Sequence, residues 1–139
     1  MIGSPPIQTQ EVVSMGKVSR GSTTEHQEME GFRGDYADVD GYTIGFERYE
    51  QDGDPAELFR GLPDDRCQCP HWGVVLKGIL IYDEADGSRT EIGEGEAYYV
   101  GPGHLPVFTA GTEIVEFSPT TELTKTIEVV MRNLEAANA

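Results

Sequence analysis

Basic residues are scarce in this sequence. Lysine and arginine together number 10, against 25 aspartates and glutamates, so the formal net charge is −15 and the isoelectric point is near 4.3. A chain this acidic has no general attraction for a polyanion, because like charges repel. We therefore expect neither nucleic acid nor an anionic membrane surface as a partner. The acidic excess is typical of a solvated surface that favours solubility.

Long apolar runs and cysteines are also scarce. No stretch approaches the roughly 18 to 20 residues that cross a bilayer, and residues 1–10 lack the basic start and apolar centre of a secretory signal. The sequence thus predicts a cytoplasmic protein. The two cysteines, Cys67 and Cys69, would then be reduced. A ligand pair or a redox pair is favoured over a structural disulfide.

The 139 residues fit one domain. Residues 1–34 are rich in small and polar types and hold no persistent period, which indicates a flexible leader. Residues 35–118 show short apolar or alternating runs separated by glycine-rich turns. The expected strands cover residues 42–49, 73–82, 88–92, 97–100, 107–109 and 113–117. This pattern predicts an all-β fold, an antiparallel sandwich or barrel.

One helix is expected at the C-terminal end, over residues 119–139. Ser118 suits the N-cap and Pro119 the first helical position. Leu123, Ile127 and Val130 then fall on one apolar face. We expect this face to pack on the outside of the barrel or on a partner subunit.

Both cysteines and two of the three histidines lie between Cys67 and His104. In an extended strand alternate side chains share a face, so Cys67, Cys69 and His71 would project to one side. Together with His104 they offer thiolate and imidazole ligands, which favour zinc, with iron, nickel and copper as alternatives. Four protein ligands would close such a site, whereas three would leave a position for water or substrate.

Two other interpretations of these residues stay open. The cysteines could be a buried, inert pair beside hydrogen-bonded histidines, since free cysteine is among the most buried residue types. Alternatively, one thiol could be a redox group or a nucleophile, which would require a lowered pKa.

The spacing of these residues resembles the two sequence motifs of the cupins, small barrels of double-stranded β-helix (jelly-roll) architecture. In the first motif Gly61 is followed, after five residues, by Cys67-Gln68-Cys69, and later by Gly78. In the second motif Gly95 is followed, after five residues, by Gly101-Pro102-Gly103-His104. The resemblance covers about residues 40–118.

The chain departs from the family's usual metal ligands, three histidines and one glutamate. Counting forward from Gly61 places the two histidines of the first motif at Cys67 and Cys69. Counting back from Gly78 places them at Asp65 and Cys67, so Asp65 could replace one cysteine as a ligand. The same count puts the family's glutamate at His71. The last family histidine falls on Pro106, two residues after His104.

The resemblance implies a cavity for a small organic molecule, a divalent metal and a homodimer. Cupins include dioxygenases, isomerases, epimerases, decarboxylases and cyclases. Our first hypothesis is a metalloenzyme whose metal polarises an oxygen or activates a water, with Tyr98 or Glu116 assisting proton transfer. The alternatives are a non-catalytic binding or sensor module, and a barrel with a purely structural metal.

Several further residues have predicted positions. Alternation places Tyr98 and Tyr99 on opposite faces of a strand, so only one of them can face the cavity. Glu47 and Tyr49 are further candidates for the cavity wall. Trp72 is expected in core or dimer packing, and His26 is interpreted as a solvated residue of the leader.

Overall fold

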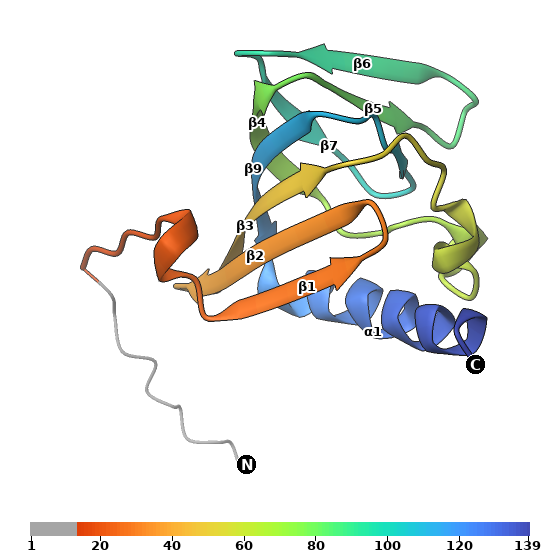
Figure 1. Ribbon diagram of the computed structural model, residues 1–139, viewed down its shortest axis with the longest axis horizontal. Coiled ribbons are helices and arrows are strands. Elements are labelled where there is room, and N and C mark those ends of the chain that lie inside the picture. Colours follow the sequence, from red (N-terminus) through yellow and green to blue (C-terminus); the bar gives the residue numbers. More distant parts are fainter. Residues whose placement is uncertain (1–13) are drawn as a thin grey trace.

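Strands dominate the structure of this chain. The computed structural model describes residues 14–139 (Figure 1). The strands are β1 (Glu25–Met29), β2 (Phe32–Val39), β3 (Tyr42–Tyr49), β4 (His71–Lys77), β5 (Ile79–Asp83), β6 (Arg89–Gly93), β7 (Ala97–Val100), β8 (Leu105–Val107) and β9 (Thr112–Pro119). The short 3-10 helices η1 (Arg20–Ser22), η2 (Ala56–Phe59) and η3 (Pro63–Asp65) and the helix α1 (Thr120–Ala137) complete the order. The predicted all-β class with a C-terminal helix is confirmed.

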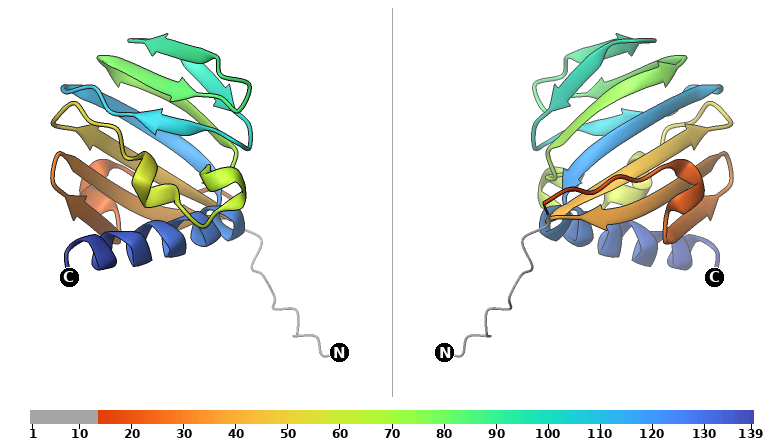
Figure 2. Two further views of the ribbon diagram at one scale, coloured as in Figure 1. Left: turned by 90° about the vertical axis from the view of Figure 1, so that its right-hand side faces the viewer. Right: turned by 90° about the vertical axis from the view of Figure 1, so that its left-hand side faces the viewer.

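The strands form two antiparallel sheets that enclose a common interior. The larger sheet has the order β1-β2-β3-β9-β4-β7, and the smaller has the order β6-β5-β8. Figure 2 shows these strands stacked in a twisted array above α1. Apolar and aromatic side chains from both sheets meet between them and form the main core: Phe32, Tyr49, Val75, Leu80, Tyr82, Ile92, Val100 and Ile114.

The sheet begins earlier in the chain than predicted. β1 and the start of β2 occupy residues 25–34, which were assigned to the leader. These residues lack a strong apolar alternation, but their backbone pairs with the rest of β2 and with β3, so the ladder rather than the side-chain pattern defines them. Residues 1–13 of the predicted leader lie outside the described residues.

The apolar run predicted as one strand over residues 73–82 is divided between the two sheets. β4 ends at Lys77 and β5 begins at Ile79, with Gly78 at a positive φ of 79° between them. A Cβ atom at this position would lie 2.7 Å from Thr112 Oγ1, so the close packing of the corner also requires glycine. Gly78 therefore turns the chain from the large sheet into the small one.

A polar row crosses the inner face of the large sheet and is centred on Glu116. Gly45 of β3 and Gly73 of β4 lie directly opposite Glu116 of β9, one on each side. A Cβ atom at Gly45 would lie 2.7 Å from the ring of Tyr36, and one at Gly73 would lie 2.6 Å from the Tyr98 hydroxyl. The missing side chains thus leave room for two tyrosines beside the glutamate.

The helix α1 begins at Thr120 with Pro119 at its N-cap position, and no side chain caps it. The predicted Ser118 cap is wrong, because Ser118 belongs to β9. α1 packs against η2, where Asn133 Nδ2 donates to the carbonyls of Leu58 and Arg60 at 2.8 Å each. Among the described residues, no helix is long and apolar enough to cross a membrane.

Candidate metal centre

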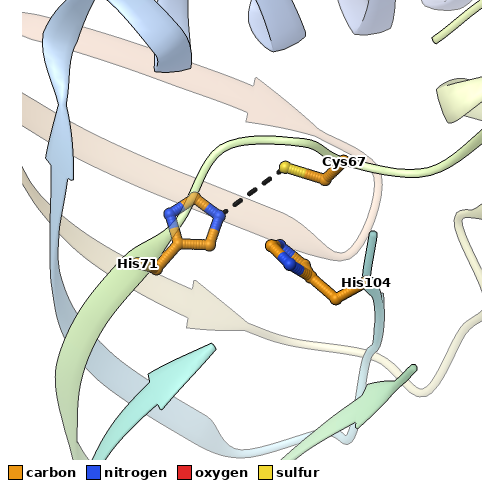
Figure 3. Close-up of side chains that lie close together, drawn as sticks. All are labelled: Cys67, His71 and His104. Carbon is orange, nitrogen blue, oxygen red and sulfur yellow. Dashed lines mark hydrogen bonds between the residues drawn. The ribbon is translucent and has the colours of Figure 1, made fainter. Parts of the chain in front are cut away.

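Three buried donors converge inside the barrel (Figure 3). Cys67 precedes β4, His71 is the first residue of β4, and His104 directly precedes β8. Cys67 and His104 face each other in an isolated antiparallel bridge, which brings segments 37 residues apart in sequence together. The three ligand atoms all lie within 4.8 Å of one another, and the rings of His71 and His104 have centroids 4.9 Å apart.

His104 presents a free nitrogen lone pair to this group. Its Nδ1 lies 2.6 Å from the carbonyl oxygen of Gly101. A carbonyl only accepts, so Nδ1–H donates and Nε2 of the neutral ring carries the lone pair. His104 is 1% exposed, and its Nε2 is the buried side-chain atom that finds no hydrogen-bond partner among the described residues. Burial, with the neighbouring His71, lowers the pKa of His104 to about 4, so the ring is neutral at pH 7.

Two residues of β9 contact the His71 ring on the side opposite to Cys67. Its Nδ1 lies 2.7 Å from Ser118 Oγ and 3.6 Å from Glu116 Oε1, which turns Nε2 toward Cys67 Sγ at 3.7 Å. Burial lowers the pKa of His71 to about 4, so this ring is also neutral at pH 7. With Nε2 as a ligand atom, Nδ1–H donates to Ser118, and the hydroxyl fixes the orientation of the ring.

Cys67 is a thiol in the absence of a positive partner. Burial raises its pKa to about 11, although hydrogen bonds from the Thr126 hydroxyl and the Cys69 backbone favour the thiolate. Thr126 Oγ1 lies 3.6 Å from Cys67 Sγ and reaches it from α1. A thiol with a raised pKa is a poor nucleophile at neutral pH, which argues against the redox or nucleophilic interpretation.

A carboxylate and two tyrosines lie next to His71. Glu116 Oε2 accepts hydrogen bonds from Tyr82 (2.7 Å) and Tyr98 (2.6 Å). Burial raises the pKa of Glu116, and the two hydroxyls oppose this shift. Tyr98 belongs to the inner face, whereas Tyr99 is 58% exposed, as the alternation predicted. Glu116 is therefore a buried group that can hold a proton within reach of the histidine.

The structure does not bring every predicted ligand to this group. Cys69 is fully buried, but its sulfur faces the Pro70 carbonyl at 3.4 Å and lies outside the cluster of Cys67, His71 and His104. Asp65 is exposed in η3 and accepts from the backbone of Gly61 at 3.0 Å. The extended strand on which the shared face of Cys67, Cys69 and His71 depended does not cover the two cysteines, because β4 begins only after Pro70.

Two aromatic or titratable residues lie away from the cluster. Trp72 is on the outer face of the large sheet, half exposed, and its ring lies against Tyr42 and Tyr99. His26 is not part of a free leader: it lies in β1, and its Nδ1 is 2.7 Å from Oδ1 of the buried Asp35. Its side chain is still 52% exposed, so it is partly solvated as expected.

A cavity of about 100 Å³ adjoins the three donors. Its wall contains Cys67, His71 and His104, together with Glu47, Tyr49 and Glu116. Leu123, Ile127 and Val130 of α1 complete the wall on another side. The apolar face of α1 therefore packs on the barrel, as one of the two predicted alternatives had it, and covers its interior.

The donor set fits a divalent metal. In a tetrahedral zinc site a sulfur and a nitrogen ligand lie about 3.6 Å apart, given Zn–S near 2.3 Å and Zn–N near 2.1 Å. Cys67 Sγ and His71 Nε2 are 3.7 Å apart. The lone pair of His104 Nε2 points into the same group with no other partner among the described residues, and a bound cation would satisfy it.

Comparison with solved structures places the fold among the cupins. An RmlC-like cupin from Shewanella frigidimarina is 19% identical, with 76% of this chain and 92% of that chain covered and a TM-score of 0.51. Ectoine synthase from P. lautus is 8% identical (76% and 78% covered, TM-score 0.53). A protein of unknown function from Rhizobium leguminosarum is 18% identical (76% and 97%, 0.54). No family model and no curated protein matches the sequence.

These likenesses establish a cupin fold for the chain. At identities below 20% they carry the architecture alone, because one fold supports many chemistries. Function must therefore be argued from the side chains of the site.

Proposed function

We propose that this protein binds a divalent metal through Cys67, His71 and His104 and acts on a small organic molecule in the adjoining cavity. One observation carries the proposal: among residues 14–139, three protein donors rather than four converge on a point in the cavity wall. Three protein ligands leave a coordination position for water or substrate, which is the arrangement of catalytic rather than structural zinc sites.

Zinc is the metal we favour, because a thiolate and two neutral imidazoles form a borderline-soft set. Iron, nickel and copper remain alternatives for the same donors. Both histidines are neutral at pH 7 and need lose no proton to bind, whereas the Cys67 thiol must lose one. Cys69, which is buried outside the group, has no role in this site.

The bound metal would supply a Lewis acid at the cavity wall. Glu116 is the residue placed to exchange a proton there, since it lines the cavity and burial raises its pKa. Tyr98 and Tyr82 hold one of its oxygens through their hydroxyls and thereby orient the carboxyl group. Glu116 also lies 3.6 Å from His71 Nδ1, so its charge acts on a metal ligand.

Cobalt substitution tests whether the proposed site is open. Cobalt(II) bound to a thiolate and two imidazoles has a visible and near-ultraviolet spectrum that responds to its coordination. We expect azide to change the spectrum of the cobalt-loaded protein, because an exogenous anion can enter the fourth position. A spectrum that azide leaves unchanged would indicate a closed site. The metal would then be structural, and the chain would be a binding module or an interaction protein.

Ser118→Ala should weaken metal binding without removing a ligand. The variant loses the hydroxyl that fixes Nδ1 of His71 at 2.7 Å. Loss of such a supporting partner typically lowers metal affinity by about 10- to 100-fold. The zinc affinity is measured by competition with a chelator. Thr124→Ala is the matched control, since Thr124 is exposed on α1 and its hydroxyl donates to the Thr120 carbonyl, its one side-chain hydrogen bond within the described part of the chain. Equal affinities in the two variants would remove Ser118 from the site.

A further inference from the structure

The charged groups that the described residues contribute to the cavity wall are all acidic. Glu47 and Glu116 line the cavity, whereas no lysine or arginine among the described residues does. Most of the remaining wall is apolar or aromatic, including Met29, Phe108 and Leu123. A ligand that enters this cavity therefore meets two carboxyl groups, the metal-binding donors and an apolar surface.

Glu47 has no role in the metal centre described above. It lies on the inner face of β3, opposite Gly34 of β2 and diagonal to Glu116 of β9. Tyr36 donates to its Oε2 at 2.7 Å, and no other described residue donates to this carboxyl group. A Cβ atom at Gly34 would lie 2.2 Å from the Tyr36 hydroxyl, so glycine is needed for this contact.

Glu47 receives fewer hydrogen bonds than a carboxylate can accept. A carboxylate accepts up to about four hydrogen bonds, and Glu47 receives one, from a neutral hydroxyl. Its side chain is partly accessible although it lies inside the barrel, because it borders the cavity. Burial and the charge of Glu116 raise the pKa of Glu47 to about 8, as expected for a carboxyl group that lacks a cationic partner.

The charges of the loaded site favour a cationic ligand. A divalent metal carries two positive charges, which the Cys67 thiolate and the neighbouring Glu116 carboxylate would balance. Glu47 would be ionised at neutral pH only beside a further cation, and no basic side chain of the described wall can supply one. The net charge of −15 also concentrates cations rather than anions at the entrance of a cleft.

We propose that the cavity recognises a small organic cation whose protonated amine binds the Glu47 carboxylate and whose apolar body lies against the aromatic and aliphatic wall. The cavity of about 100 Å³ limits the ligand to a small molecule. This inference rests on the proposed function only for the end of the ligand that reaches the metal. The amine contact itself needs Glu47 alone.

Three probes of similar shape and different charge test this inference: n-butylammonium, n-butanol and butyrate. Their dissociation constants are measured by chemical-shift titration of the full-length, zinc-incubated protein. We expect n-butylammonium to bind at least about tenfold more tightly than the other two, as for a hydrogen bond between charged groups. Tighter binding of butyrate or n-butanol, or no binding of n-butylammonium, would overturn the inference.

Two variants locate the contact and separate this inference from the metal proposal. Glu47→Gln keeps the shape and the Tyr36 contact but removes the charge, so the preference for n-butylammonium should disappear. An unchanged preference would show that Glu47 does not bind the amine.

His104→Ala should retain the preference for n-butylammonium, because the amine contact does not use the metal. Butylammonium binding without metal uptake would refute only the metal site, and metal uptake without butylammonium binding would refute only the amine site.

Discussion

His104→Ala should yield a protein that no longer retains zinc. Wild-type protein incubated with zinc and then desalted is expected to carry about one metal ion per chain. The variant should carry close to none, because a site of three protein donors loses one of them. The loss should exceed the roughly 10- to 100-fold that follows removal of a supporting partner. Elemental analysis of zinc against protein concentration provides the measurement.

The chain offers a close control for this result. Cys69→Ser changes a fully buried sulfur two residues from Cys67, but Cys69 lies outside the converging group. This variant should retain its metal, whereas Cys67→Ser should lose it. Metal loss in Cys69→Ser would restore Cys69 as a ligand. Full metal content in His104→Ala would mean that the unpartnered Nε2 nitrogen serves some other purpose.

The sequence predicts most of the barrel because alternation and glycine turns are local signals. The strand at residues 42–49 and the turn at Asp86-Gly87, which joins β5 to β6, lie where the pattern places them. β1 was missed because its side chains are mostly polar and partly exposed, so only its pairing with β2 makes it a strand. Edge strands of this kind leave little trace in the hydrophobic pattern.

The sequence predicts part of the metal centre, but Cys67 reaches the site for a different structural reason than strand parity. Parity along a regular strand grouped Cys67, Cys69 and His71. The chain from Cys67 to Pro70 is irregular, and Cys67 reaches the site because it pairs with His104 in an isolated bridge. The residue types were therefore informative, whereas the assumed regular strand led to Cys69 as a ligand.

The supporting residues depend on contacts that no local pattern contains. Ser118 meets His71 across 47 positions, and Thr126 meets Cys67 across 59. A serine followed by proline is the typical sequence of a helix N-cap. This local signal led to Ser118 being predicted as the cap of the helix, whereas it lies in β9. One signal was available: residues 114, 116 and 118 share strand parity, so a buried Glu116 implies an inward Ser118.

Glu47→Gln should change how stability depends on pH. In the unfolded chain a glutamate has a pKa near 4.5, and in the folded protein burial and Glu116 raise that of Glu47 to about 8. Between these values the folded state binds a proton that the unfolded state does not. The stability contributed by the protonated group is thus lost as pH rises toward 8. The slope is at most about 1.4 kcal/mol per pH unit.

The difference between wild-type protein and Glu47→Gln over the interval from pH 6.5 to 8 isolates this effect. Burial lowers the pKa of both His71 and His104 from 6.5 to about 4, so between these values they make the protein more stable as pH rises, opposite to Glu47. Above pH 6.5 the folded-state histidines no longer titrate, and the unfolded-state histidines lose their remaining protons in wild-type protein and in Glu47→Gln alike, so their contribution cancels in the comparison. Over this interval wild-type protein should lose about 2 kcal/mol of unfolding free energy through Glu47. Glu47→Gln should lose markedly less.

Urea unfolding of metal-free protein at several pH values measures this difference. Glu94→Gln is the control, since it makes the same change of charge in an exposed turn. Above pH 6.5 the wild-type and Glu94→Gln curves should stay together and should lose stability relative to the Glu47→Gln curve. Parallel curves for all three proteins would show that Glu47 is ionised in the fold at neutral pH, already matched by some favourable interaction.

If Glu47→Gln stabilises the protein, the result also indicates whether the Glu47 carboxyl group has a structural or a ligand-binding role. A buried acid that costs stability at neutral pH contributes nothing to the fold that glutamine could not, because both accept the hydrogen bond from Tyr36. Natural proteins keep such groups where activity or binding requires them. Higher stability at pH 8 combined with loss of the preference for an amine would therefore identify Glu47 as a ligand-binding group rather than a structural one.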